Sequence, residues 1–453
     1  MIPVLTPEEM RAVDRAAPEP VEVLVERAGS AVARTALAML GGAYGRRVVV
    51  VAGKGNNGAD GLVAAERLRR QGVRVQVIDA GDQPDRLPPS DLVVDAAFGT
   101  GFRGEYAAPD PSGARVLAVD IPSGVDGLTG EAVEGAVRAT TTLTFGALKP
   151  GLVLGAGFEH AGEVTVADIG LDVSRSTIGL VEASDVGGWL PGLPRDSHKW
   201  KSAIWMVAGS PGMTGAADMA AGAAMRAGAG TVRLGIPGQP PAPRYPEIIG
   251  RHLPAEGWDD DVIAGDLGRM KAVVLGPGLG RSDATASAVR RLLAKAEVPV
   301  VVDADALFAL GSLDDPPRFL RNRPGPTILT PHDGEFSRLA GCPPGPRRIS
   351  AVRHLASTTG ATVLLKGSTT IVADPAGDVL LTTAGDARLA TAGSGDVLAG
   401  VVGALVAQGL PASRAAIAGA FVHGTAAGLG WRRGLVAGDL LDLLPAVLNQ
   451  LAP

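Results

Sequence analysis

The chain has 453 residues and a formal net charge of −5 at pH 7. This length exceeds what one hydrophobic core usually serves, so two domains are expected. The acidic balance excludes a broad basic surface for nucleic acid, and the single cysteine, Cys342, excludes an internal disulfide. The N-terminus is too acidic and broken for a signal peptide, and no uncharged apolar run reaches the roughly 18 residues of a membrane span. We therefore expect a cytoplasmic protein without membrane or nucleic-acid partners.

The first 170 residues carry the pattern of an open α/β sheet. Residues 5–40 predict one or two helices. Runs rich in Val, Ile and Leu then alternate with helical patterns, at residues 46–53, 73–79, 91–99, 115–124, 140–146 and 162–170. Continuous apolar runs of this length indicate strands covered on both faces, and their spacing leaves room for crossover helices. The pattern predicts a mostly parallel sheet.

A second series of strand-like runs begins near residue 203. The runs lie at residues 203–210, 230–237, 271–278, 298–307, 326–334, 361–367, 369–374 and 378–385, and Ala-rich helices follow at about 395–409, 412–428 and 437–450. Between the two series, the glycines and prolines of residues 186–199 are expected to interrupt any regular element. We therefore predict two α/β domains, residues 1–190 and 196–453, with the boundary near Arg195.

A glycine-rich loop, Gly53–Gly61, follows the first strand and opens a helix. It satisfies G-x-G-x-x-G, and Asp79 ends the next strand, as in a dinucleotide-binding dehydrogenase. A purely structural glycine turn is a second interpretation. However, the loop's two asparagines and its aspartate supply polar side chains that a pyrophosphate cradle of backbone N–H groups does not need. They favour a polar ligand or a cation, although the residues alone leave all three interpretations open.

Further polar segments follow later strands, at the edge where open α/β sheets bind ligands. Asn57, Asp95 and Ser123 together offer only oxygen ligands, which suits a hard cation. Taken singly, each has a plainer interpretation. Asp120 suits a strand-end carboxylate bonded to loop amides, and Ser123 suits a turn residue or a helix cap.

The second half carries a glycine-rich loop of its own, Ala392–Asp396, which leads directly into a helical pattern. Glycines let backbone N–H groups face an anion, and the helix dipole adds to the attraction, so the loop suits phosphate. A simple helix cap by Ser394 or Asp396 is the alternative. The segments Lys366–Thr370 and Thr330–Glu335 follow other strands, and no Walker A sequence occurs in the chain.

In this order, the motifs of the first half resemble the NAD(P)H-hydrate epimerase domain: Gly53–Gly61, Asp95–Gly101, Asp120–Gly124 and Thr144–Gly151. The resemblance implies a Rossmann-like parallel-sheet sandwich, a potassium ion bound by Asn57, Asp95 and Ser123, and acid/base chemistry by Asp120 at the hydrated ring carbon. The contacts that it implies with the hydrated cofactor are Asn56, Asn57, Gly58, Ala59, Asp60, Gly99, Thr100, Gly101, Phe102, Arg103, Gly104 and Glu105.

The second half resembles the ribokinase-like superfamily, in which the aspartate of a G-x-G-D motif is the catalytic base, and more narrowly its NAD(P)H-hydrate dehydratase branch. The narrower likeness rests on His198–Lys199, Ala208–Ala216, Gly276–Gly280, Pro331–Glu335 and Gly434–Leu444. It implies a ribokinase-like α/β/α sandwich with Asp396 as base. The implied substrate contacts are Ala216, Gly278, His332, Asp333, Gly334, Glu335, Phe336, Ser337 and Arg338, and the implied nucleotide contacts are Lys366, Gly367, Ser368, Thr369, Thr370, Ala392, Gly393, Ser394 and Gly395.

The resemblance implies a two-step repair of hydrated NADH and NADPH (NADHX and NADPHX). Epimerisation would be followed by phosphorylation of the S epimer's hydroxyl, with ADP (or ATP) and magnesium, and by elimination to the reduced cofactor, AMP and phosphate. We also expect a homo-oligomer. The residues alone leave two other classes open: a kinase of small alcohols with an accessory N-terminal domain, and a binding scaffold whose N-terminal half lacks catalysis.

Overall fold

The computed structural model describes residues 1–192, 194–240, 242–311 and 318–452. The chain divides into two compact units. One comprises Ile2–Ile178, and the other comprises Met1 and the residues from Gly179 onward. None of the described helices is long and apolar enough to cross a membrane.

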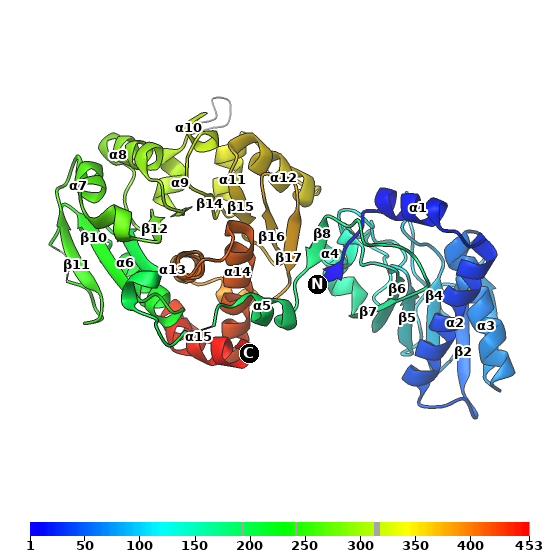
Figure 1. The fold of residues 1–453 in the computed structure, drawn as a ribbon. Coiled ribbons are helices and arrows are strands. Elements are labelled where there is room, and N and C mark those ends of the chain that lie inside the picture. Colours follow the sequence, from blue (N-terminus) through cyan, green and yellow to red (C-terminus); the bar gives the residue numbers. More distant parts are fainter. Residues whose placement is uncertain (193, 241, 312–317, 453) are drawn as a thin grey trace. The chain divides into compact units, whose positions relative to one another are not determined.

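The N-terminal unit is built around a parallel sheet (Figure 1). The strands of this sheet are β2 (Arg47–Ala52), β3 (Arg74–Asp79), β4 (Leu92–Ala96), β5 (Arg115–Val119), β6 (Thr141–Phe145) and β7 (Glu163–Ala167). The unit also contains the short strand β1 (Ile2–Pro3), which is not part of this sheet, and the helices α1 (Pro7–Ala16), α2 (Val21–Leu40), α3 (Asn56–Arg70) and α4 (Gly155–Ala161). The sheet order is β3-β2-β4-β5-β6-β7, and every pairing in it is parallel. The predicted strands and the two preceding helices are therefore confirmed.

Alternation along the central strands fills both faces of this sheet. Val48 and Val50 of β2 pack with α2 and α3, which lie against each other on one face. Val49 and Val51 point to the other face, where they pack with Leu87 and other residues of the loops. Since successive strand residues face opposite sides, a continuous valine run produces a strand that is buried on both faces. Packing on both faces fixes the position of β2, and the glycine loop begins directly after its carboxyl end.

The C-terminal unit holds the second series of strands. They are β8 (Ile178–Leu180), β9 (Ala203–Val207), β10 (Thr231–Pro237), β11 (Ile249–Leu253), β12 (Ala272–Leu275), β13 (Val300–Val302), β14 (Thr327–Leu329), β15 (Thr362–Leu365), β16 (Thr370–Ala373) and β17 (Val379–Thr382). The order runs β8-β17-β16-β15-β14-β13-β12-β9-β10-β11. Along this order, neighbouring strands from β15 to β11 pair in parallel. Strand β16 pairs antiparallel with both β15 and β17.

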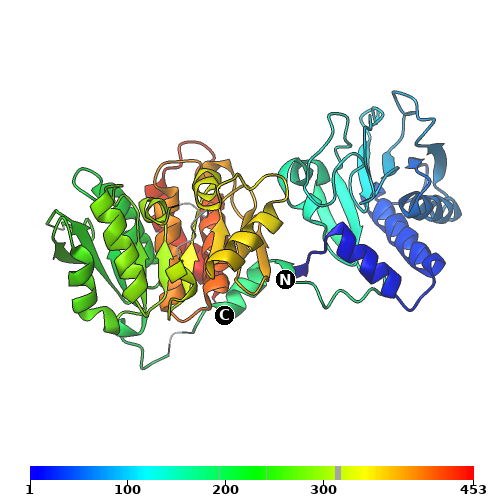
Figure 2. The ribbon, with the colours of Figure 1, turned by 90° about the horizontal axis from the view of Figure 1, so that it is seen from above.

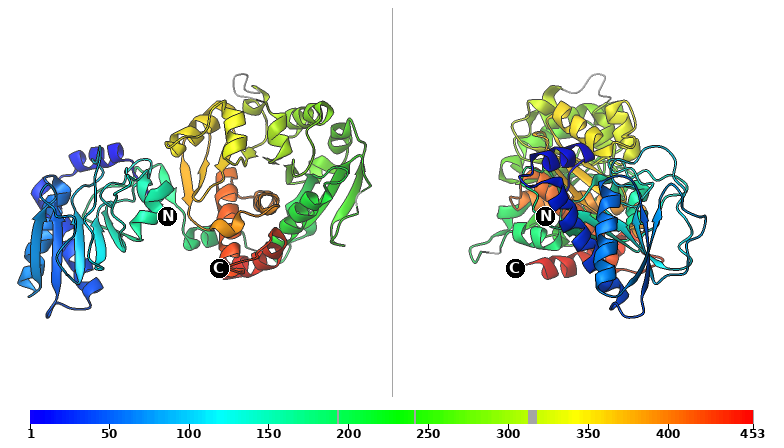
Figure 3. Two further views of the ribbon diagram at one scale, coloured as in Figure 1. Left: turned by 180° about the vertical axis from the view of Figure 1, so that it is seen from behind. Right: turned by 90° about the vertical axis from the view of Figure 1, so that its right-hand side faces the viewer.

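Helices cover both faces of this second sheet. They are α5 (Ala183–Trp189), α6 (Thr214–Arg226), α7 (Trp258–Ala264), α8 (Asp283–Lys295), α9 (Asp305–Ala309), α10 (Arg318–Arg321), α11 (Asp333–Ala340), α12 (Arg348–Thr359), α13 (Ser394–Ala407), α14 (Ala412–Leu429) and α15 (Ala437–Leu451). In the view from above, α7, α8 and α12 lie on the near side of the sheet and α13 and α14 behind it (Figure 2). Helices α6, α13, α14 and α15 pack against one another (Figure 3). Alanine and glycine on these helices permit the close packing.

The division between the units falls at Gly179, upstream of the boundary expected near Arg195. The reason is α5, which forms in spite of its two glycines and packs against α14 and α15. A Cβ on Gly187 would lie 2.5 Å from the carbonyl oxygen of Leu451, so glycine here allows two backbones to approach. The expectation that residues 186–199 hold no regular element is wrong for this segment.

Candidate functional site

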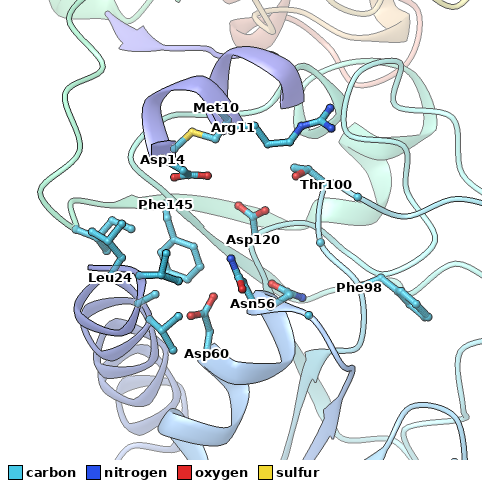
Figure 4. Close-up of a pocket in the computed structure, with 18 of the residues that line it drawn as sticks. Met10, Arg11, Asp14, Leu24, Asn56, Asp60, Phe98, Thr100, Asp120 and Phe145 are labelled. Atoms are coloured by element: carbon cyan, nitrogen blue, oxygen red, sulfur yellow. The ribbon is translucent and has the colours of Figure 1, made fainter. Parts of the chain in front are cut away.

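The N-terminal unit contains a cavity of about 510 Å³ at the carboxyl edge of its sheet. Helix α1, the start of α2, the loop into α3, the loop after β4 and the end of β5 all contribute to its lining (Figure 4). The predicted residues Asn56, Asn57, Asp60, Gly99, Thr100, Gly101, Phe102 and Asp120 line it. Gly58, Ala59, Arg103, Gly104 and Glu105 are not among the lining residues.

Asp120 stands at the end of β5 and faces this cavity (Figure 4). Its φ of 65° places an aspartate in the left-handed region, which is uncommon outside glycine and marks a position fixed by its surroundings. Lys149 Nζ lies 2.6 Å from Asp120 Oδ1, and Thr144 Oγ1 donates a 3.0 Å hydrogen bond to the same oxygen. Lys149 is 1% exposed and also donates to the Phe145 carbonyl. The ion pair and the hydrogen bond fix the direction of the Asp120 carboxylate.

Two further carboxyl groups enter the cavity. Asp60 projects from the first turns of α3 and Asp14 from α1 (Figure 4). Burial, together with the neighbouring carboxylates of Asp120 and Asp14, raises the pKa of Asp60 to about 8. Burial also raises the pKa of Asp14, which Lys149 opposes. The cavity therefore combines acidic groups in different states of ionisation.

Of the three predicted potassium ligands, Asn57 lines the cavity, whereas Asp95 and Ser123 do not. Asp95 and Ser123 are almost fully buried, and Ser123 Oγ donates a 2.7 Å hydrogen bond to Asp95 Oδ1. Burial raises the pKa of Asp95 to about 6, which hydrogen bonds from Ser123 and Ala97 oppose. Both polar atoms of the Asn57 side chain are buried and have no hydrogen-bond partner among the residues that the structure describes. An orphaned amide oxygen of this kind needs a ligand, so the oxygen-only donor set fits a cation.

Helix α3 can begin beside the cavity only because its loop is glycine-rich. A Cβ on Gly58 would lie 1.8 Å from the Gly53 carbonyl oxygen, and one on Gly53 would lie 1.9 Å from the Ala97 carbonyl oxygen. These glycines bring three backbone segments into contact. The tight turn predicted from the sequence therefore sets where Asn56, Asn57 and Asp60 project.

In the C-terminal unit, Asp396 lies in the first turn of α13, directly after the loop Gly393–Gly395. Gly393 has a φ of 90°, which favours glycine. Asp396 is half-buried and has no hydrogen bond or ion pair with a described residue. Burial raises its pKa to about 6, the carboxylate of Asp303 adds to the rise and Lys366 opposes it. A free carboxylate thus stands beside the helix start, where a base would be needed.

A buried network positions Lys366 next to this loop. Lys366 Nζ and Thr330 Oγ1 donate hydrogen bonds of 2.7 and 2.8 Å to Asp303 Oδ1. Asp303 is 1% exposed, and a Cβ on Gly395 would lie 3.2 Å from Lys366 Nζ. The lysine charge therefore borders the glycine loop, where it would favour a phosphate group.

A buried hydrogen-bonded pair, Ser394 and His423, stabilises the start of α13. Ser394 Oγ and His423 Nε2 are 3.2 Å apart, and both residues are buried. Burial lowers the pKa of His423 to about 4, so its imidazole is neutral at pH 7. The ring can share one hydrogen bond with the serine without bringing a charge into the interior.

The segment His332–Arg338 forms the start of α11. His332 caps the helix, since its Nδ1 accepts hydrogen bonds from the Gly334 and Glu335 amides. Asp333 is ion-paired with Arg348, which lowers the pKa of Asp333. His332, Gly334, Glu335 and Arg338 line a cavity of about 270 Å³ together with Arg281, Ala304, Leu307 and Phe308. By contrast, Phe336 is 1% exposed and its side chain belongs to the core.

Gly278 and Ala216, predicted from distant segments, lie together. A Cβ on Gly278 would be 3.0 Å from the Ala216 Cβ, and Ser210 Oγ donates a 2.9 Å hydrogen bond to the Gly278 carbonyl. Thr369 is buried, and the Lys366–Thr370 segment links β15 to β16. The roles of these residues toward a ligand stay predictions.

Several residues at the two sites were given no role of their own from the sequence. They are Asp14, Lys149, Asp303, Thr330 and His423, of which Thr330 belongs to the segment Thr330–Glu335 and Asp303 to the strand-like run 298–307. Lys149 belongs to the motif Thr144–Gly151, so the motif marked the place although it gave the lysine no role. No local signal marks Asp14 or His423, because each reaches its site from a helix far away in the chain.

Comparison with known proteins assigns the chain to a family. Residues 204–446 match the family described as NAD(P)H-hydrate dehydratase, and residues 21–86 and 79–151 match the one described as YjeF-related protein N-terminus. A bifunctional NAD(P)H-hydrate repair enzyme of Mycobacterium leprae is 41% identical over 445 residues, which cover 90% of each chain. The chain belongs to the family of bifunctional NAD(P)H-hydrate repair enzymes. A member from Moorella thermoacetica is 36% identical and covers 99% of this chain and 97% of its own.

Similar solved structures confirm the predicted fold of the C-terminal unit. An ADP/ATP-dependent NAD(P)H-hydrate dehydratase of Bacillus subtilis, co-crystallised with ATP and Mg²⁺, matches 60% of this chain and 97% of its own, with a TM-score of 0.52 and 29% identity. A ribokinase-like superfamily protein of Enterococcus faecalis matches with a TM-score of 0.52 at 19% identity, over 61% of this chain and 97% of its own. The expected α/β class and ribokinase-like architecture are therefore correct.

Proposed function

We propose that the chain repairs hydrated nicotinamide cofactors in two steps. The N-terminal domain, residues 1–190, interconverts (R)- and (S)-NAD(P)H-hydrate, and the C-terminal domain, residues 196–453, dehydrates the S epimer with a nucleotide as phosphoryl donor. The observation that carries this function is Asp396, a carboxylate that no described residue pairs with, beside a glycine-lined helix start and the half-buried Lys366. Relatives that match almost the whole chain bear the name of bifunctional repair enzymes.

In the epimerase reaction, the hydrated ring enters the cavity lined by Asn56 and Asp120, with Gly99–Phe102 along its wall. Asp120 is the acid/base group beside the hydroxylated carbon that moves protons as the epimers interconvert. Lys149 and Thr144 hold its Oδ1, which leaves Oδ2 for the substrate. Arg103, Gly104 and Glu105 follow the wall in the chain and contact the remainder of the cofactor.

Potassium would be bound by Asn57, Asp95 and Ser123, because the buried Asn57 amide lacks a partner and the donor set consists of oxygens. When bound, the ion supplies positive charge that offsets the buried Asp95 carboxylate and anchors the loops that carry Asn57 and Ser123. The protein's own part is to keep Ser123 Oγ on Asp95 and to direct the Asn57 carbonyl toward the ion.

In the dehydratase reaction, Lys366–Thr370 and Ala392–Gly395 hold the phosphates, and the substrate lies along Ala216, Gly278 and the start of α11. Asp396 removes the proton of the substrate hydroxyl as that oxygen attacks the terminal phosphorus. Hydroxide is a poor leaving group, whereas the phosphate ester formed can be eliminated to restore the ring double bond. The relative co-crystallised with ATP and Mg²⁺ supports a nucleotide with magnesium in this domain.

Single epimers test the two activities separately. The R epimer without nucleotide should become a mixture of both epimers, and the S epimer with ADP should yield the reduced cofactor, measured by its absorbance. A stable phosphorylated product without reduced cofactor would instead identify a small-molecule kinase. Failure of both ADP and ATP to support recovery from the S epimer would contradict the dehydratase function.

A further inference from the structure

Asp60 is a buried carboxyl group for which the functions above provide no chemical role. It is 7% exposed, and no described residue forms a hydrogen bond or ion pair with its side chain. It lines the 510 Å³ cavity, and Figure 4 shows its carboxyl group pointing into that space from α3. An unpaired buried carboxyl group is costly unless it is protonated or meets a ligand, so its position calls for a function.

The surroundings of Asp60 and Asp120 differ in the way that separates an acid from a base. Asp120 has the Lys149 ammonium group at 2.6 Å and the Thr144 hydroxyl at 3.0 Å, and both interactions require or favour a carboxylate. Asp60 has no cation beside it and faces the carboxylates of Asp120 and Asp14 across the cavity. Two carboxyl groups in one site with opposed surroundings are the arrangement by which acid and base roles are divided.

We propose that Asp60 is a second catalytic residue of epimerisation, a general acid that protonates the departing hydroxyl while Asp120 acts as the base on water entering from the other face of the ring. This role rests on the proposed epimerase function and adds to it the group that makes the carbon–oxygen bond break.

The step balances without any other reagent. Water adds to an enamine at the carbon next to nitrogen, so the hydroxyl of the hydrate sits beside the ring nitrogen. As the carbon–oxygen bond breaks, the nitrogen lone pair forms a carbon–nitrogen double bond and Asp60 gives its proton to the hydroxyl, which leaves as water. A second water then adds to the opposite face and gives a proton to Asp120. The enzyme ends with Asp60 ionised and Asp120 protonated, which is the state that carries out the reverse conversion.

Asp60 suits the acid role better than Asp14 does. Asp14 lies at the exposed rim, on α1, and has Lys149 among its neighbours. Asp60 lies deeper, and burial raises its pKa to about 8, which keeps its carboxyl group protonated at neutral pH. Proton donation to a leaving group by a side chain in place typically accelerates a reaction by about 10² to 10⁴.

The first test compares Asp60→Asn with the wild-type full chain in conversion of the R epimer, without nucleotide. We expect kcat to fall by about 10²-fold or more while KM stays within about twofold, because asparagine keeps the shape and the polar contacts but has no acidic proton. Asp82→Asn is the matched control, because Asp82 is an exposed carboxylate in the loop after β3, and it should keep the wild-type rate. An unchanged kcat in Asp60→Asn overturns the assignment, as does a loss that occurs only together with a lowered thermal transition.

The second test follows the oxygen. In water enriched in ¹⁸O, each wild-type epimerisation should introduce one solvent oxygen at the inverted carbon, measured by mass spectrometry against a sample without enzyme. Inversion that retains the original oxygen overturns the departure of water and with it the acid role of Asp60. A wild-type chain that does not interconvert the epimers at all contradicts the epimerase function itself, which distinguishes that failure from a failure of the Asp60 assignment.

Discussion

Each domain places its proposed base close to a lysine, which is buried in the case of Lys149 and half-buried in the case of Lys366, and the two lysines act differently. Lys149 bonds directly to Asp120. Lys366 is bonded instead to Asp303, and Asp396 is left without a partner. A base that must approach a hydroxyl and a phosphate benefits from this freedom, whereas the base of epimerisation benefits from a fixed direction.

Replacing Asp396 by Asn should abolish most of the dehydratase activity. The amide cannot accept the hydroxyl proton, so kcat for the S epimer with ADP should fall by about 10² to 10⁴. Interconversion of the epimers should continue at the wild-type rate. Asp378→Asn, which removes an exposed carboxylate in a turn, should change neither activity, and a similar loss in that variant would point to a general effect of charge.

The pH dependence of dehydration should report the same residue. Asp396 is a base only when ionised, and its pKa is raised to about 6 by burial and Asp303, with Asp305 and Glu335 adding to the rise against Lys366. We therefore expect kcat/KM for the S epimer to be constant above about pH 7 and to fall roughly tenfold per pH unit below pH 6. A profile that stays flat down to pH 5 would show that another group accepts the proton.

At the scale of elements, both sites depend on the way a helix begins after a glycine loop. In α3 the requirement is steric, since Gly58 packs on the Gly53 carbonyl. At the start of α13, Gly393 is required for its positive φ, and Ser394 is required for the hydrogen bond between its hydroxyl and His423. The helix start fixes the position of the reacting groups that follow it.

Gly58→Ala should displace α3 from its loop. Its Cβ would lie 1.8 Å from a backbone oxygen that cannot rotate away. We expect a loss of about 1–3 kcal/mol or more in the stability of the N-terminal domain, together with loss of epimerisation, whereas dehydration of the S epimer persists. Gly55→Ala is the control for folding, since nothing lies within 4 Å of its Cβ. Equal thermal transitions for the two variants would contradict the packing described for Gly58.

His423→Leu should weaken the start of α13. It leaves the buried Ser394 hydroxyl without its partner, which costs about 1–3 kcal/mol, and should raise the KM for the nucleotide. His423→Gln can keep a hydrogen bond to Ser394 and should remain closer to the wild type at pH 7. Calorimetry of the C-terminal transition checks both variants, and a leucine variant as stable as the glutamine variant would exclude a structural role for the hydrogen bond.

At the scale of the whole molecule, the central strands of the sheets were predicted from the sequence more fully than the edge strand β11 and the helix α5. The valine-rich runs that became β2, β4 and β13 are unambiguous because both faces are buried. Edge strand β11 was missed, because Arg251 and His252 are exposed and break the apolar pattern. Helix α5 was missed because its glycines signal a loop unless the close approach to Leu451 is known.

The candidate sites were predictable where loops carry the residues and not where helices bring them from afar. Asp120 and Asp396 follow a strand and a glycine loop, so local patterns reveal them. The roles of Lys149, Asp303 and His423 as partners depend on tertiary packing, so the segments that carry them did not reveal what each side chain contacts. For the same reason, only the structure shows that Asp333 is paired with Arg348 and that Phe336 is buried.

The most direct test of two cooperating activities is recovery of reduced cofactor from mixed epimers with excess ADP. For the wild-type chain we predict complete recovery in one enzyme-dependent phase. For Asp120→Asn we predict rapid recovery of the S fraction alone, followed by a slow phase set by uncatalysed epimerisation. If the wild-type chain stops at the S fraction, or if Asp120→Asn follows the wild-type time course, the account of the N-terminal domain is contradicted.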